Sequence, residues 1–316
     1  MSTLVAGIGW FAVNSTSGAF ALQALTGLPI EVSLLIIVLV QIGVAFVGHN
    51  LIQKFERYAF YYLVVVFGIG SVLVLGQGNY TIAADHSAFN LAGFTLTAAA
   101  AYGYTAGWTA FASDYTRYLP ANTDSKSLGW AAGLGNWFAT TLLMSVGAAA
   151  DGNPTTNFTA LFHNDVLAAL TLLGIAVGSV GANVLNVYSG AMSFLAMGFK
   201  LGFKTRRAIM TALAGVVGSI TAYAAIKGDF VSGFEGFLLV VSYWVAPWIA
   251  VVFTDWLLRG RKVSENVLDH KRENFCNQVQ YTGPLATAWG VGDITPLVGF
   301  VLAAVLYAAL GGAKKN

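Results

Sequence analysis

The sequence has little of the polar material that a soluble protein of its length needs. Only 9% of its 316 residues are charged, whereas soluble domains average about 25%, and 57% of the residues are hydrophobic. A surface that faces water cannot be built from so few polar residues. The composition therefore excludes an ordinary cytosolic enzyme, a nucleic-acid-binding protein and a disordered chain, and it indicates a protein that lies mostly in lipid.

Residues that build covalent and metal sites are also scarce. Cys276 is the only cysteine, which excludes an internal disulfide and a cysteine-based metal site. The four histidines are scattered and fit no ligand spacing, and the sequence contains no P-loop, dinucleotide-binding, zinc-protease or serine-hydrolase motif. We therefore predict a protein that is not an enzyme and that uses neither a metal nor a cofactor.

Long apolar stretches alternate with polar segments along the whole chain. Nine of them are close to the roughly 20 residues that a membrane-spanning helix needs, at residues 3–25, 30–48, 58–77, 91–112, 127–150, 169–198, 208–226, 234–257 and 294–311. Strands of a membrane barrel would be shorter and would alternate apolar with polar residues. The sequence thus predicts an all-α polytopic membrane protein, with residues 1–316 forming one membrane domain.

The basic residues orient these spans. Almost all of them lie in one alternating set of loops, at residues 49–57, 114–127, 200–207 and 259–283. Cytoplasmic loops carry such an excess, so we predict that these loops and the N-terminus face the cytoplasm. Nine spans would then leave Lys314 and Lys315 outside, which suggests that one span is missing near residues 271–284.

Polar side chains inside lipid are costly unless they pair or face water, so those within the spans are candidates for function. Trp10 and Asn14 share one face of the first span, four residues apart. Asn183 and Asn186 lie three residues apart in the sixth span. No Asp, Glu, Lys or Arg stands out near the middle of a span, which argues against a chain of buried carboxylates that relays protons.

Indole rings and amides together suit a flat, uncharged ligand. An asparagine amide offers two donors and an acceptor, which matches the alternating edge of a nucleobase, and stacking on an aromatic ring is worth about 1–3 kcal/mol per base. Each residue alone is equally well explained by packing or by a hydrogen bond between helices. Two such groups in separate spans favour a binding site.

The fourth span is rich in glycine and aromatic residues. Gly103 and Gly107 are four residues apart, and Trp108 follows directly. The stretch predicts either a close helix contact through its small residues or an interrupted helix whose free backbone groups face a cavity.

Several motifs occur in one order across nearly the whole chain. The most specific is Ser113-Asp-Tyr-Thr-Arg-Tyr118; the others are Gly9-Trp-Phe-Ala-Val-Asn14, Gly48-His-Asn-Leu-Ile-Gln-Lys-Phe-Glu-Arg57, Asn183-Val-Leu-Asn-Val-Tyr-Ser-Gly190, Tyr243-Trp-Val-Ala-Pro-Trp248 and Asn277-Gln-Val-Gln-Tyr-Thr-Gly-Pro284. Together they resemble the nucleobase–cation symporter family, in its purine–cytosine permease branch.

The resemblance implies a twelve-helix transporter of the LeuT-type inverted-repeat fold. Such a protein works by alternating access and imports a nucleobase, cytosine or a purine, by cation symport. In this chain the family's first two helices and most of its eleventh are absent, so about nine of the twelve helices remain. The implied location is the plasma membrane, and the implied partners are a small nucleobase and the lipid bilayer, with no nucleic acid and an open oligomeric state.

The resemblance also implies roles for individual residues. Substrate contacts fall on Trp10, Asn14, Gly107, Trp108, Asn183 and Asn186. Gating or structural roles fall on Asp114, Arg117, Tyr243 and Trp248. Sodium-coupled relatives add hydroxyl groups just before the amides of the eighth family helix, where this chain has Ser179 alone. We therefore expect H⁺ rather than Na⁺ as the co-transported ion.

Two alternatives stay open. The chain could be a truncated membrane protein that derives from such a permease and transports nothing. It could also be a family member that carries a related ring compound, such as a hydantoin, allantoin or thiamine.

Overall fold

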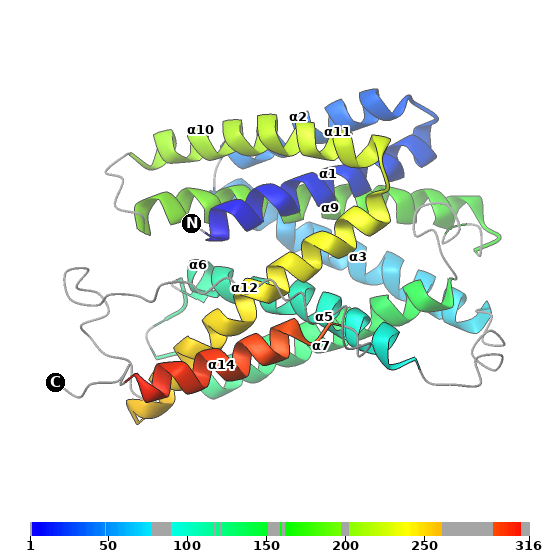
Figure 1. The fold of residues 1–316 in the computed structure, drawn as a ribbon. Coiled ribbons are helices and arrows are strands. Elements are labelled where there is room, and N and C mark those ends of the chain that lie inside the picture. Colours follow the sequence, from blue (N-terminus) through cyan, green and yellow to red (C-terminus); the bar gives the residue numbers. More distant parts are fainter. Residues whose placement is uncertain are drawn as a thin grey trace. The chain divides into compact units, whose positions relative to one another are not determined.

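The computed structural model is built almost entirely of helices (Figure 1). It describes residues 2–47, 49–77, 90–116, 118–120, 122–150, 159, 162–196, 202–260 and 293–310, and no strand occurs among them. The chain forms two compact units, the first from Met1–Ser87 and Ala110–Val231 and the second from Ala88–Thr109 and Ser232–Asn316. A single domain over residues 1–316 stays a prediction.

Each of the nine predicted apolar stretches is helical over most of its described residues. The first unit contains α1 (Ser2–Thr26), α2 (Ile30–Val47), α3 (His49–Gln77), α6 (Ala112–Thr116), α7 (Ser125–Ala149), α9 (Asp165–Ala196), α10 (Phe203–Leu213), the π-helical turn η2 (Ala214–Gly218) and α11 (Ser219–Lys227). The second unit is built from α5 (Leu91–Gly107), most of α12 (Phe230–Leu258) and α14 (Thr295–Ala309).

Five helical segments of the described chain are long and apolar enough to cross a membrane. They are Val5–Thr26, Lys54–Gln77, Asp165–Ser193, Lys204–Lys227 and Phe230–Leu258, and Ile30–Ala45 and Thr295–Ala309 are shorter apolar helices. The structure thus confirms an all-α, multi-pass membrane protein. Nine spans and a cytoplasmic N-terminus stay predictions, and residues 271–284, where we expected a missing span, lie outside the described residues.

Helix α3 begins earlier than the sequence predicted. We expected residues 49–57 to form a polar loop, but α3 starts at His49 and continues without a break to Gln77. The polar segment contains Gln, Lys, Glu and Arg, which are good helix formers, and neither glycine nor proline. As a result, Glu56 lies on a helix that packs against α9.

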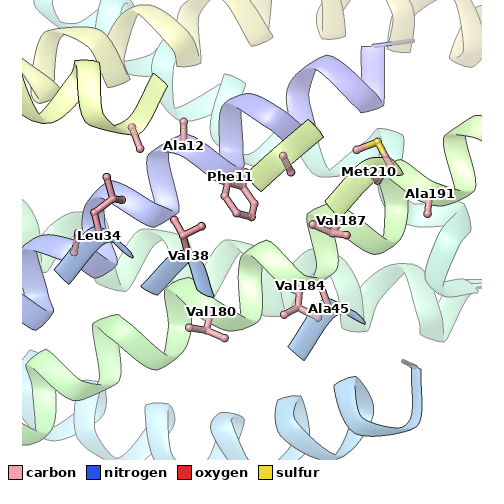
Figure 2. Packing of buried hydrophobic residues seen from close by; sticks show 13 residues of the cluster. Phe11, Ala12, Leu34, Val38, Ala45, Val180, Val184, Val187, Ala191 and Met210 are labelled. Carbon is pink, nitrogen blue, oxygen red and sulfur yellow. The ribbon is translucent and has the colours of Figure 1, made fainter. Parts of the chain in front are cut away.

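The core of the first unit lies where α1, α2, α9 and α10 pack together. Figure 2 shows Phe11 projecting from α1 toward α9, with Val38 of α2, Val187 of α9 and Met210 of α10 around it. Helices in lipid associate through close van der Waals packing, which small residues permit. Gly218 is such a residue, because a Cβ there would lie 2.6 Å from Cδ1 of Phe11.

The second unit depends on an equally close contact between α5 and α12. Gly103 of α5 lies against the backbone carbonyl of Leu238, so the predicted contact through small residues is confirmed. At the other end of α12, the Asp255 carboxylate accepts hydrogen bonds from Nε of Arg259 at 2.9 Å and from the Tyr307 hydroxyl at 2.7 Å. This second contact ties α12 to α14.

The interruption predicted in the fourth apolar stretch is also confirmed. Helix α5 ends at Gly107, a 3₁₀ turn follows over Trp108–Phe111, and the short helix α6 starts at Ala112. Gly103 therefore makes the close contact and the α-helix breaks at Trp108, while a cavity facing the free backbone groups stays a prediction.

The start of helix α7 provides a pH-dependent test of the fold. The Asp124 carboxylate accepts hydrogen bonds from the Ser127 hydroxyl at 2.6 Å and from the Ser127 and Lys126 amides at 3.0 and 3.3 Å. These bonds, the Ser127 hydroxyl first, hold the pKa of Asp124 below its ordinary value. A lowered folded-state pKa stabilises the protein above the unfolded-state pKa of about 3.9, and this stabilisation is lost as the pH falls through the lowered pKa.

We therefore expect Asp124→Ala to lower the melting temperature at neutral pH, with the difference from wild type narrowing in acid. Thermal unfolding of the purified protein in detergent, at neutral pH and in acid below the pKa of Asp124, measures the difference in melting temperature. Asn164→Ala is the matched control, because Asn164 caps α9 with an uncharged amide that accepts from the Leu167 amide at 3.0 Å. Its effect should be equal at both pH values. A difference for Asp124→Ala that does not change with pH would contradict the assignment.

Candidate functional site

Asn183 is the centre of a buried hydrogen-bonded cluster between α1 and α9. Its Nδ2 donates to the Phe11 carbonyl oxygen at 3.0 Å and to the Ser15 hydroxyl at 3.2 Å. Its Oδ1 accepts from Nδ2 of Asn14 at 3.0 Å and from Nδ2 of Asn186 at 3.2 Å. An amide side chain has two donor hydrogens and two acceptor lone pairs, so protein groups use the full bonding capacity of Asn183.

Asn14 and Asn186 differ from Asn183 because their side chains keep hydrogen-bonding groups that no described protein group uses. Each uses one N–H to reach the shared Asn183 oxygen, and within the described residues their side chains make no further hydrogen bond. Each therefore keeps one N–H and one carbonyl oxygen. Asn14 is partly exposed and Asn186 is nearly buried. The structure thus holds two amides on one acceptor, with a donor and an acceptor remaining on each.

Two residues that the sequence analysis did not single out extend this cluster to α2. The Ser15 hydroxyl donates to Oε1 of Gln41 at 2.9 Å, and Nε2 of Gln41 donates to the Ser179 carbonyl oxygen at 3.4 Å. The side chains of Ser15 and Gln41 are fully buried. A glutamine in an otherwise apolar stretch of α2 is the signal that could have identified Gln41, because an unpaired amide in lipid is costly.

Trp10 and Asn14 both lie on α1, one helical turn apart, as predicted. Trp10 is almost completely buried. The other predicted substrate residues, Gly107 and Trp108, lie in the second unit, at the point where α5 ends and the 3₁₀ turn begins. The structure therefore brings together Asn14, Asn183 and Asn186 in the first unit.

The predicted gating residues fall in both units. Tyr243 lies on α12, and its hydroxyl donates to the buried Asp293 carboxylate. The other oxygen of Asp293 accepts from the Thr295 amide at 2.9 Å, which fixes it at the start of α14. Trp248 lies half-buried on α12, directly after Pro247. Asp293 carried no sequence signal, because it follows a long polar segment and lies 50 residues from its partner.

The motif around Asp114 connects to the helix that carries the amides. Asp114 is buried in α6, and Arg117 lies outside the described residues. Tyr118, at the end of the same motif, is hydrogen-bonded through its hydroxyl to the hydroxyl of Tyr188. Tyr188 is buried on α9 two residues after Asn186. This hydrogen bond therefore joins the segment after α6 to α9 close to Asn186.

The chemistry of the first-unit cluster is neutral throughout. Its side chains are the amides of Asn14, Gln41, Asn183 and Asn186 and the hydroxyl of Ser15, and none of them carries a charge. A charged ligand would lose its hydration here without gaining an opposite charge, whereas a neutral ring with donors and acceptors along one edge can replace its water contacts by amide contacts. The site therefore suits a flat, uncharged heterocycle.

Comparison with known proteins points the same way. A family model described as permease for cytosine/purines, uracil, thiamine, allantoin matches residues 1–277. A protein of Bacillus subtilis (strain 168) that is assigned as a purine-cytosine permease is 24% identical over 335 residues, which cover 96% of this chain and 73% of the relative.

Two fungal relatives show similar matches. The purine-cytosine permease fcyB of Emericella nidulans is 25% identical over 97% of this chain and 68% of its own length. A purine-cytosine permease of Saccharomyces cerevisiae is 25% identical over 84% of this chain and 54% of its own length.

Proposed function

This chain belongs to the family of permeases for cytosine/purines, uracil, thiamine and allantoin, and we propose that it carries a nucleobase, cytosine or a purine, across the membrane. The relatives are permeases and not enzymes. The names of these relatives support the substrate class, and the neutral amide cluster of the first unit supports it independently.

The observation that carries the proposal is the pair of amides held on Asn183. Asn14 and Asn186 each keep one N–H and one oxygen, and our proposal is that these groups present a donor and an acceptor to the base. Nucleobases present such pairs, for example the N6 amino group and N7 of adenine, which asparagine contacts in a bidentate manner. We assign base-edge recognition to Asn14 and Asn186, and stacking to Trp10.

The mechanism that we propose is cation symport by alternating access. The helical stretches of this chain would belong to a twelve-helix, LeuT-type inverted-repeat fold in the plasma membrane, with a cytoplasmic N-terminus. Tyr243 and Trp248 on α12, together with Asp114 and Arg117, would act in gating. H⁺ is the proposed coupling ion because Ser179 is the one hydroxyl residue among residues 174–182, and its Oγ donates to the Ile175 carbonyl oxygen at 2.8 Å.

A binding titration of the purified protein in lipid nanodiscs tests this function. Cytosine, adenine, hypoxanthine, uracil, allantoin and thiamine are each titrated by calorimetry, and uptake of the ligand that binds is then followed in cells that express the chain. We expect cytosine or a purine to bind most tightly. Binding of allantoin or thiamine alone would select the alternative ring compounds, and binding without uptake would select a non-transporting protein.

Asn14→Ala and Asn186→Ala should each lower the affinity for the nucleobase about tenfold, because each removes a hydrogen bond worth about 1–1.5 kcal/mol. Asn136→Ala is the matched control, since Asn136 is an exposed asparagine on α7 that bonds only to Thr140 within the described residues. An equal loss of affinity in Asn136→Ala would contradict the assignment, as would full affinity in both cluster variants.

A further inference from the structure

Glu56 is an acidic residue that the sequence placed in a polar loop but that lies on helix α3 in the structure. It lies on α3 within the apolar segment Lys54–Gln77, and its side chain is partly buried. The oxygen Oε1 is completely buried and has no hydrogen-bond partner within the described residues. An ionised carboxylate oxygen that is removed from water needs a cation or a donor in place of its hydration, so the position of Oε1 requires an explanation.

The buried oxygen of Glu56 lies directly against helix α9. A Cβ built on Gly181 would lie 2.7 Å from Oε1 of Glu56 and 3.3 Å from Cε1 of Phe55. Only a residue without a side chain allows the carboxyl group to lie so close to the α9 backbone. Gly181 precedes Asn183, the centre of the amide cluster, by two residues, so the carboxyl group and the cluster share one short segment of α9.

No described charged group compensates Glu56. On its own helix, Lys54 and Arg57 are exposed and make no ion pair with it in the part of the chain that the structure describes. Among the helices that pack on α3, α9 carries Asp165, exposed in its first turn, and Tyr188, bonded to Tyr118.

The remaining two neighbours of α3 carry charges only near their first residues. Helix α7 has Lys126, which is exposed. Helix α2 has Glu31, which forms an exposed ion pair with Lys227 at 2.8 Å. None of these groups offers Glu56 a buried positive charge, and a proton is the simplest species that would neutralise its carboxylate.

We propose that Glu56 is the proton-binding group that couples H⁺ to the nucleobase, an inference that rests on the proposed function. The carboxylate takes up one proton from solution, an O–H bond forms, and the charge of the side chain changes from −1 to zero. The proton and the base act on the same segment of α9, at Gly181 and at Asn183. Coupling between two sites is reciprocal, so a base that favours the protonated carboxyl group binds more tightly as the pH falls.

Calorimetry with purified protein in buffers of different ionisation enthalpy counts the protons that accompany binding. With cytosine, or whichever base binds the wild type, we expect uptake of about one proton per base and an affinity that rises as the pH falls. Glu56→Gln should still bind the base, but without proton uptake and with an affinity independent of pH.

Two further variants keep the result interpretable. Glu31→Gln removes an exposed carboxylate on α2 and should leave the proton uptake unchanged. Gly181→Ala keeps the carboxyl group but displaces it from α9, and we expect the pH dependence of affinity to weaken while binding persists; this variant decides the matter if Glu56→Gln does not fold. A wild type that binds the base without proton uptake, or a Glu56→Gln variant with unchanged uptake, would overturn the inference. A wild type that binds no base at all would instead overturn the proposed function.

Discussion

Asn183→Ala is expected to lower the affinity for a nucleobase about 100-fold, although the Asn183 amide is fully bonded within the protein. The Asn183 oxygen is the shared acceptor that orients Asn14 and Asn186. Its removal leaves the side-chain amides of Asn14 and Asn186 free to rotate. Two hydrogen bonds to the base, each worth about 1–1.5 kcal/mol, would then be weakened together, and 1.4 kcal/mol corresponds to a factor of about ten. Calorimetric titration against wild type measures the loss.

The matched control for Asn183→Ala is Thr171→Val on the same helix. Thr171 is also fully buried, and its hydroxyl has no hydrogen-bond partner within the described residues. Valine has nearly the same shape, so this variant should bind the base as the wild type does. If Asn183→Ala binds the base with unchanged affinity, the cluster does not orient the ligand. If Thr171→Val loses affinity equally, the effect comes from general disturbance of α9.

Gly103→Ala should lower the free energy of unfolding by about 1–3 kcal/mol, the usual cost of overpacking a tight contact. A Cβ at this position would overlap the Leu238 carbonyl oxygen and lie 2.9 Å from its carbonyl carbon. These are backbone atoms, so no change of side-chain rotamer can relieve the clash, and α5 must move away from α12. Thermal unfolding in detergent, followed by tryptophan fluorescence, reports the loss.

Gly236→Ala gives the corresponding control in α12. A Cβ on Gly236 meets no atom within 4 Å, and alanine favours a helix over glycine by up to about 1 kcal/mol. We therefore expect this variant to be as stable as wild type or slightly more stable. A Gly103→Ala protein that melts at the wild-type temperature would show that α5 and α12 do not pack at this glycine.

The sequence was sufficient to predict the helices and to single out the three amides that the structure brings together. In lipid the backbone N–H and C=O groups must be hydrogen-bonded within the protein, which excludes irregular backbone exposed to lipid. Apolar stretches of about 20 residues therefore predict helices directly. Asn14, Asn183 and Asn186 could be identified for the same reason, because an amide in an apolar helix must find a partner. The break at Trp108 was signalled by the neighbouring glycines.

Tertiary packing decided what the sequence could not predict. Glu56 belongs to a run of polar residues that is typical of a cytoplasmic loop, and only the packing of α3 against Gly181 buries its oxygen. Gln41 was assigned no role, yet it links α2 to Ser15 and to α9. The sequence also could not show that Asn183 is the shared acceptor of Asn14 and Asn186, because this depends on which amide oxygen the other two amides contact.

The most direct test of the central claim is a thermodynamic cycle at the amide cluster. Asn183→Ala is introduced into wild type and into the Asn14→Ala/Asn186→Ala double variant, and the affinity for the base is measured in all four proteins. If Asn183 acts by orienting the other two amides, its replacement costs about 100-fold in wild type but no more than about twofold in the double variant, the scatter expected of independent sites. The same large loss in both backgrounds would contradict the account.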